Sequence, residues 1–190
     1  MTAIVAVRDP RVVVLVGNPK AGSRTRQLAE RTADAIVPGA DATTVDIATL
    51  AGGLLVPWQL SAEAAAAVDA VLAADLVVLG TPTYKASYPG VLKLFLDAFA
   101  AGSLTRTIVQ PVITAGGEVH RHLVDIHLRP VLTELGALTP VPSLIITESE
   151  IGRFSELLDE HVLQHGPALR AVLDAVAGRP TTTPTAEALR

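Results

Sequence analysis

The chain has 190 residues, of which 49% are hydrophobic and 18% charged, and this composition excludes disorder for most of the chain because so apolar a sequence can bury a core. Its 15 Lys and Arg against 19 Asp and Glu give a formal net charge of −4, which argues against nucleic acid as a partner because such proteins present a basic face. The chain has no cysteine, which excludes disulfides, thiolate catalysis and Cys-ligated metal centres.

Short runs of Val, Leu and Ile alternate along the chain with longer segments whose apolar residues recur at helical spacing. The apolar runs predict strands at residues 11–16, 43–46, 76–80, 107–114 and 144–147. The periodic segments predict a helix through Leu28, Ala29, Ala33 and Ile36, and helices over residues 61–74, 90–99, 119–135 and 155–177. Ser61 is expected to cap the second helix, because a Ser side chain there accepts from a free backbone N–H.

Continuous apolar strands that alternate with helices indicate a parallel sheet covered on both faces. Five such units predict a flavodoxin-like, doubly wound five-stranded parallel sheet of order 2-1-3-4-5, in a three-layer αβα arrangement. We expect one domain over residues 1–177 and a disordered tail at 178–190, where Thr and Pro are frequent. Ligands of such sheets bind at the carboxyl ends of the strands.

A membrane span is not expected. The longest apolar stretch, residues 62–80, is interrupted by Glu63, Asp69 and Asp75, whereas a spanning helix needs about 20 mostly apolar residues. The apolar segment at residues 3–7 is too short for a signal peptide. We therefore expect a cytoplasmic protein whose apolar excess lies in the core or between subunits.

The segment from Gly17 to Thr25 joins the first strand to the first helix. Three cations fall within it or beside it, together with hydroxyl groups at Ser23 and Thr25, at a helix start that attracts anions. The cations are Lys20, Arg24 and Arg26. Ser23 stands at the lysine position of a nucleoside-triphosphate loop, and Pro19 replaces the second glycine of a dinucleotide fingerprint. The loop suits a single terminal phosphate such as that of FMN, although Ser23 and Thr25 can equally serve as helix caps.

Two further loops follow the third and fourth strands. Pro82, Thr83, Tyr84 and Lys85 belong to a proline-bounded segment that can present side chains to a flat conjugated ring. Thr114, Gly116 and Gly117 end the fourth strand, where glycines let a ligand approach the backbone. The alternatives are that the tyrosines only cover the sheet end and that the glycines form an ordinary turn.

Four segments in this order resemble the NADPH-dependent FMN reductase family of flavodoxin-like proteins, and in particular the sulfonate-utilisation flavin reductases that supply two-component monooxygenases. They are G-N-P-K-x-x-S-R-T at 17–25, G-T-P-T-Y-K-A-S-Y-P-G-V-L-K-L-F-L-D at 80–97, T-A-G-G at 114–117 and V-D-x-x-L-R-P-V-L at 124–132. The resemblance extends over residues 11–173. It implies FMN as cofactor, NADPH or NADH as hydride donor, and a flavin-dependent monooxygenase as partner of a homodimer or homotetramer.

The resemblance also assigns the binding residues. It implies that Ser23, Arg24 and Thr25, with Pro19 in the same loop, hold the FMN phosphate. The segment 82–85 lies along the ribityl chain and the isoalloxazine, and the loop of Thr114, Gly116 and Gly117 meets the pyrimidine edge. Flavin-releasing members often carry an inserted residue, typically aromatic, that makes a π-bulge in the helix matching 119–135. Here no tyrosine is present, and an insertion at Ile126, one at His127, or none stays open.

No catalytic side chain and no metal site are expected. His120 and His122 would point to different faces of a helix, and the segment lacks the spacing of a zinc-binding motif. The predicted function is hydride transfer from NADH or NADPH to flavin N5, which needs no side-chain acid or base. Two alternatives stay open: a quinone or azo reductase with tightly bound FMN, and a non-catalytic electron carrier.

Overall fold

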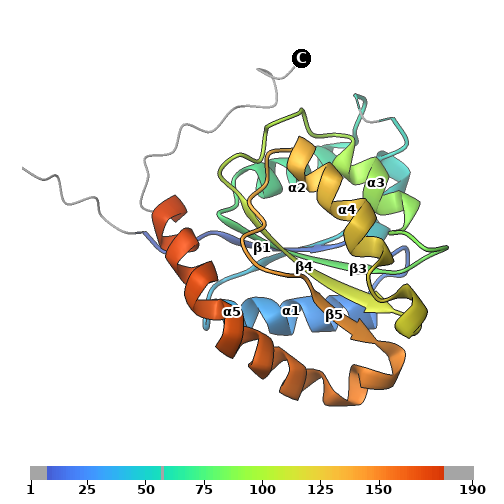
Figure 1. The fold of residues 1–190 in the computed structure, drawn as a ribbon. Helices are drawn as coiled ribbons and strands as arrows, with labels where there is room; N and C mark the ends of the chain where they lie inside the picture. The colour runs from blue at the N-terminus through green and yellow to red at the C-terminus, as the bar shows by residue number, and fades with distance from the viewer. Residues whose placement is uncertain (1–7, 57, 178–190) are drawn as a thin grey trace, which may run out of the picture.

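A computed structural model describes residues 8–56 and 58–177, and its centre is one parallel sheet (Figure 1). The strands are β1 (Val12–Val16), β2 (Thr43–Asp46), β3 (Leu76–Pro82), β4 (Ile108–Ala115) and β5 (Leu144–Thr147). Their order across the sheet is β2-β1-β3-β4-β5, and every neighbouring pair is parallel. The predicted flavodoxin-like order 2-1-3-4-5 is therefore confirmed. The tail expected at 178–190 lies outside the described residues.

Helices cover both faces of the sheet, which makes the three layers that the alternation predicts (Figure 1). They are α1 (Arg24–Ile36), α2 (Ala62–Leu72), α3 (Gly90–Leu96), α4 (Leu123–Glu134) and α5 (Phe154–Ala177). Alternate residues of each strand point to opposite faces. Val13 and Leu15 of β1 pack in the core under α2, α3 and α4, whereas Val12, Val14 and Val16 pack with α1 and α5.

Several element ends differ from the prediction, for local reasons. The third strand continues past Gly80, because Thr81 and Pro82 still pair with β4. The helix expected over 90–99 ends at Leu96, since Ala98 and Phe99 donate to carbonyls three residues back and form turns. The helix expected from residue 119 begins at Leu123, after a separate short 3₁₀ helix at Glu118–His120. Ser61 does cap α2, as predicted: its side chain accepts from the N–H of Ala64.

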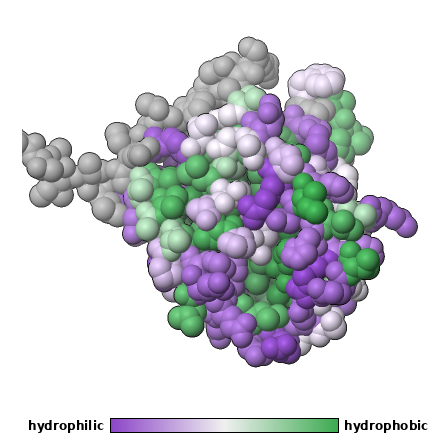
Figure 2. Space-filling model, viewed as in Figure 1, coloured by the Kyte–Doolittle hydropathy of each residue, from purple (hydrophilic) through white to green (hydrophobic). Residues whose placement is uncertain are grey.

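Some large apolar side chains remain outside the two cores. Figure 2 shows one face of the molecule, on which apolar side chains lie among polar ones. Trp58, in the segment after β2, is 84% exposed, and Val119 and Leu163 are each 82% exposed. Among the described residues, no helix is both long enough and apolar enough to cross a membrane.

Candidate functional site

The carboxyl ends of β1, β3, β4 and β5 meet at one edge of the sheet, because all these strands run in the same direction. Hydrogen bonds join the first residue after β1 to β3, and the first residue after β3 to β4. Gly17 N–H donates to the Gly80 carbonyl at 2.7 Å, and Thr83 N–H donates to the Thr114 carbonyl at 2.8 Å. The structure thus brings the three predicted loops together.

The β1–α1 loop, residues 17–23, is held by buried side chains. Asn18 Nδ2 donates to Thr25 Oγ1 at 3.1 Å, and Asn18 Oδ1 accepts from the N–H of Lys20 at 2.9 Å. Thr25 Oγ1 lies 3.2 Å from Thr114 Oγ1 of β4. Asn18 and Thr25 are both buried. The hydroxyl of Thr25 therefore shapes the loop, which is a role that the sequence did not separate from ligand binding.

The start of α1 presents free donors. Ser23 caps the helix, and its Oγ accepts from Arg26 N–H at 3.3 Å, which leaves the hydroxyl proton available. Within the described residues, the backbone N–H groups of Arg24 and Thr25 have no acceptor. Such unpaired amides at a helix start, where the dipole is positive, form a ready anion site. The alternatives of capping and anion binding are compatible here, since Ser23 caps through oxygen.

The charge of this region is more balanced than the sequence indicates. Arg24 Nη2 bonds Glu148 Oε1 at 2.9 Å, and Arg26 Nε bonds Glu30 Oε1 at 2.8 Å. Arg26 Nη1 also lies 3.9 Å from Asp46 Oδ2. Lys20 and Pro19 lie exposed on the same loop, and the Lys20 ammonium group has no acidic partner in the described part of the chain.

Sequence reasoning missed Asp46 and Glu148 as members of the site. Asp46, buried at the end of β2, accepts from Gly22 N–H at 3.1 Å and so anchors the β1–α1 loop. The only sequence signal for Asp46 was its position at the end of a predicted strand. Glu148 is 124 positions from Arg24, so no local pattern could have paired them.

The β3–α3 loop, residues 83–89, contains a small hairpin. Tyr84 and Ser87 exchange two backbone hydrogen bonds, of 2.7 and 3.0 Å. Lys85 and Ala86 between them have φ of +49° and +64°, as a type I′ turn requires. Tyr84 and Lys85 are exposed at this tip, and Thr83 Oγ1 is buried without a partner. Pro82, predicted as part of the loop, is the buried last residue of β3.

Beyond Thr114, the backbone of Gly116 and Gly117 is open. A Cβ built on either glycine would meet no atom within 4 Å, and neither residue has a left-handed φ. Packing and backbone conformation therefore do not require glycine here. Gly116 comes two residues after Thr114, whose hydroxyl lies beside that of Thr25, and a ligand at the glycines could contact their backbone amides.

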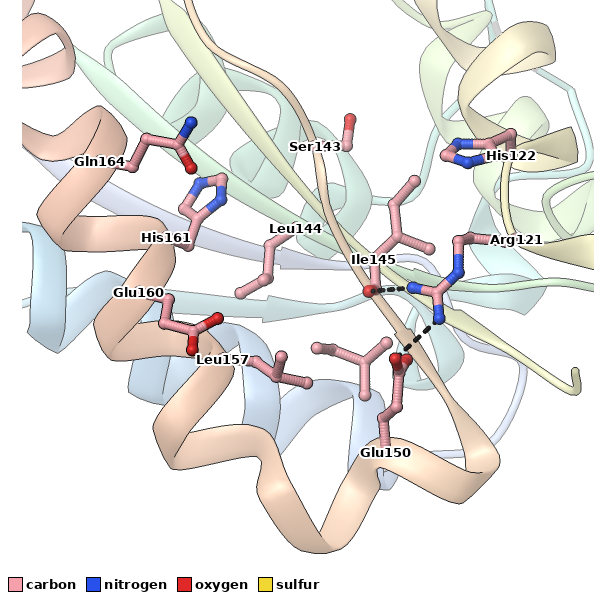
Figure 3. A pocket seen from close by; sticks show the side chains of 11 residues that line it. Arg121, His122, Ser143, Leu144, Ile145, Glu150, Leu157, Glu160, His161 and Gln164 are labelled. Carbon is pink, nitrogen blue, oxygen red and sulfur yellow. Dashed lines mark hydrogen bonds and ion pairs between the residues drawn. The ribbon is translucent and has the colours of Figure 1, made fainter. Parts of the chain in front are cut away.

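A cavity of about 290 Å³ lies outside these loops, along the edge strand β5 (Figure 3). Arg121 donates to the Ile145 carbonyl at 3.2 Å and to Glu150 at 2.7 Å, and Glu150 accepts from Thr147 N–H at 2.9 Å. The bond from Arg121 lowers the pKa of Glu150 to about 2. These side chains cover backbone groups of an edge strand, a structural role.

The histidines that suggested a metal site do not converge. His120, His122 and His127 are exposed, and the described residues contain no group of three or more potential ligands. On the opposite side of the cavity, burial lowers the pKa of His161 to about 4, with a smaller effect from His165 (Figure 3). Residues 123–134 are α-helical, with no π-bulge at Ile126 or His127, although Pro130 has no N–H to donate to the Ile126 carbonyl.

Comparisons with known proteins agree with this geometry. A family model described as NADPH-dependent FMN reductase matches residues 10–150. The NADH-dependent FMN reductase SfnF of Pseudomonas fluorescens is 34% identical over 109 residues, which cover 57% of this chain and 58% of that protein. SfnF of Pseudomonas putida is 33% identical over 135 residues, covering 68% of this chain and 73% of that protein.

A solved structure, the apo form of the NADH:FMN oxidoreductase EMOB, superimposes with a TM-score of 0.77 at 29% identity, over 94% of this chain and 96% of that one. The chain spans about three fifths of the length of the Pseudomonas fluorescens relative and of an FMN reductase (NADPH) from Pseudomonas aeruginosa, 58% and 59% respectively.

Proposed function

Because the chain belongs to the NADPH-dependent FMN reductase family, we propose that it reduces FMN with a nicotinamide dinucleotide and releases reduced FMN to a flavin-dependent monooxygenase. The observation that carries this proposal is the meeting of three features at one sheet edge: the free amides of Arg24 and Thr25, the exposed Tyr84 hairpin and the open backbone at Gly116 and Gly117.

The residues present fit FMN. The amides of Arg24 and Thr25, the Ser23 hydroxyl and the Arg24 guanidinium offer donors to a phosphate. The unpartnered Thr83 Oγ1 can bond a ribityl hydroxyl. Tyr84 can cover the ring face, and the amides beyond Thr114 can meet the polar ring edge. Pro19, Pro82 and Lys85 complete this proposed set.

FMN bound here would supply the hydride acceptor, its N5 atom, for the C4 hydride of the nicotinamide, and this chemistry would belong to the cofactors. The contribution of this chain is position: donors at α1 hold the phosphate end, while the β3–α3 loop and the glycines hold the ring end. No side chain has to move a proton. The nicotinamide is NADH or NADPH, and we propose that the enzyme acts as a cytoplasmic homodimer or homotetramer.

Steady-state oxidation of NADH and of NADPH, with and without added FMN, tests the proposal. We expect added FMN to stimulate oxidation of at least one dinucleotide, with the purified protein colourless after gel filtration. A yellow protein with ping-pong kinetics toward quinones or azo dyes would instead indicate a quinone or azo reductase with tightly bound FMN. Negligible oxidation of NADH and NADPH under all conditions would indicate a non-catalytic electron carrier.

The Arg24→Ala variant tests the phosphate site. Loss of a charge-assisted hydrogen bond should weaken FMN binding about tenfold or more, while riboflavin, which has no phosphate, binds nearly as before. Quenching of flavin fluorescence measures both affinities. Arg170→Ala removes the same charge from an exposed position of α5 and serves as the control. Equal losses for the two flavins would place the phosphate elsewhere.

A further inference from the structure

The ion pair between Arg24 and Glu148 links the first residue of α1 to the first residue after β5. The Nη2–Oε1 distance is 2.9 Å, and the two side chains are 62% and 53% exposed. Arg24 is the guanidinium that the proposed function assigns to the FMN phosphate. In the structure described, this group already binds an anionic oxygen that the protein itself provides.

Glu148 lies in a segment that is firmly held. It begins the 3₁₀ helix η4 (Glu148–Arg153), whose capping box joins Thr147 to Glu150 through the backbone and the side chain. Glu150 is in turn tied to Arg121, and that bond keeps the Glu150 carboxylate ionised by lowering its pKa to about 2. The backbone next to Glu148 is therefore fixed by two neighbours, and its carboxylate stays within reach of Arg24.

The charged side chains around the start of α1 have no net positive charge. The three cations, Lys20, Arg24 and Arg26, are equal in number to the acids that pair with the two arginines, Glu30, Asp46 and Glu148, so the formal sum is 3 − 3 = 0. A phosphate that arrives at the Arg24 amide carries about −1.5 to −2 charges. It must share the guanidinium with the Glu148 carboxylate and is repelled by it.

We propose that Glu148 competes with the FMN phosphate for Arg24 and thereby weakens the hold on FMN, so that FMN exchanges as a substrate. The inference rests on the proposed function and adds a specificity-determining residue to it. Glu148 lowers the affinity for phosphorylated flavins alone, because riboflavin has no phosphate for Arg24 to bind. It is a positioning residue, since it reaches the flavin through the guanidinium.

The Glu148→Gln variant tests this competition. We expect FMN to bind about two- to fivefold more tightly and to dissociate more slowly, the size expected for loss of an exposed ion pair, while riboflavin affinity stays unchanged. Most of the gain should disappear when Glu148→Gln is combined with Arg24→Ala. Glu134→Gln removes an equal charge at the end of α4, where the Glu134 carbonyl accepts from Gly102 N–H before β4. It should change neither FMN affinity nor riboflavin affinity.

Each outcome decides between the proposals. FMN affinity that is unchanged in Glu148→Gln overturns the competition, and weaker FMN binding makes Glu148 a support for Arg24 instead. An equal gain for riboflavin would also overturn it, since the effect would not pass through the phosphate. If the wild-type protein oxidises neither NADH nor NADPH with FMN, the proposed function fails independently of these affinities.

Discussion

The β1–α1 loop and the β3–α3 loop lie at the same edge of the sheet but are held by different means. The first is fixed by buried polar side chains: Asn18 bonds Thr25 and the Lys20 amide, and Asp46 bonds the Gly22 amide. The second has its tip in solvent and places Lys85 and Ala86, neither of them glycine, at positive φ.

This difference fits the two ends of the proposed ligand. A phosphate needs several donors in fixed directions, and a loop whose side chains are already bonded can keep them there without ordering cost. The face of the flavin ring needs a covering side chain that still lets the nicotinamide ring enter, and an exposed hairpin can provide one. The left-handed tip stores strain that the first loop does not contain.

The largest effect is predicted for Gly80→Ala in β3, which should displace α1 and so disturb the first loop. A Cβ at Gly80 would lie 2.9 Å from Ala29 Cβ and 3.1 Å from the Thr25 carbonyl oxygen, so α1 must shift away from β3. We expect the free energy of unfolding to fall by about 2–3 kcal/mol, with a loss of FMN affinity. Urea denaturation measures the first, and fluorescence quenching measures the second.

Gly90→Ala is the matched control, because a Cβ there meets nothing within 4 Å and the residue begins α3. It should leave stability unchanged or slightly higher, since Ala favours helix. If Gly80→Ala were as stable as this control, the close contact between α1 and β3 would not hold the first loop.

A smaller effect is expected from Thr25→Val, which keeps the shape of the side chain but removes its hydroxyl. The buried Asn18 amide then loses its acceptor, and unfolding should need about 1–2 kcal/mol less. FMN affinity should fall several-fold, because the Thr25 amide loses its fixed direction. Thr25→Ser restores the hydroxyl and should recover most of both losses. An unchanged Thr25→Val would contradict the idea that buried bonds shape this loop.

The alternation of apolar runs and helical segments was enough to predict the five strands, their order and the edge where the loops meet. These features follow from local patterns and from the general rules of parallel sheets. Capping by Ser23, one of the two alternatives that the sequence left open, could be proposed in the same way, because capping is a local event.

The sequence could not reveal contacts between distant segments. The pairs of Arg24 with Glu148 and of Gly22 with Asp46 depend on how the chain folds back, and a charged residue at a strand end looks the same with or without a partner. The Tyr84 hairpin was also missed. Its turn is Lys-Ala rather than Asn-Gly, so the usual signal for positive φ is absent.

The smallest predicted effect applies one change, Ala to Gly, to both loops and expects opposite signs. At Ala86 glycine relieves the left-handed strain, which outweighs its entropic cost, so Ala86→Gly should raise the free energy of unfolding by about 0.5–1 kcal/mol. At exposed Ala21 in the β1–α1 loop, where φ is not left-handed, Ala21→Gly should lower it by about 0.4–1 kcal/mol. Thermal unfolding of the two variants beside the wild type measures the difference. A loss of stability in both would mean that the hairpin tip holds no strain and that the two loops differ only in exposure.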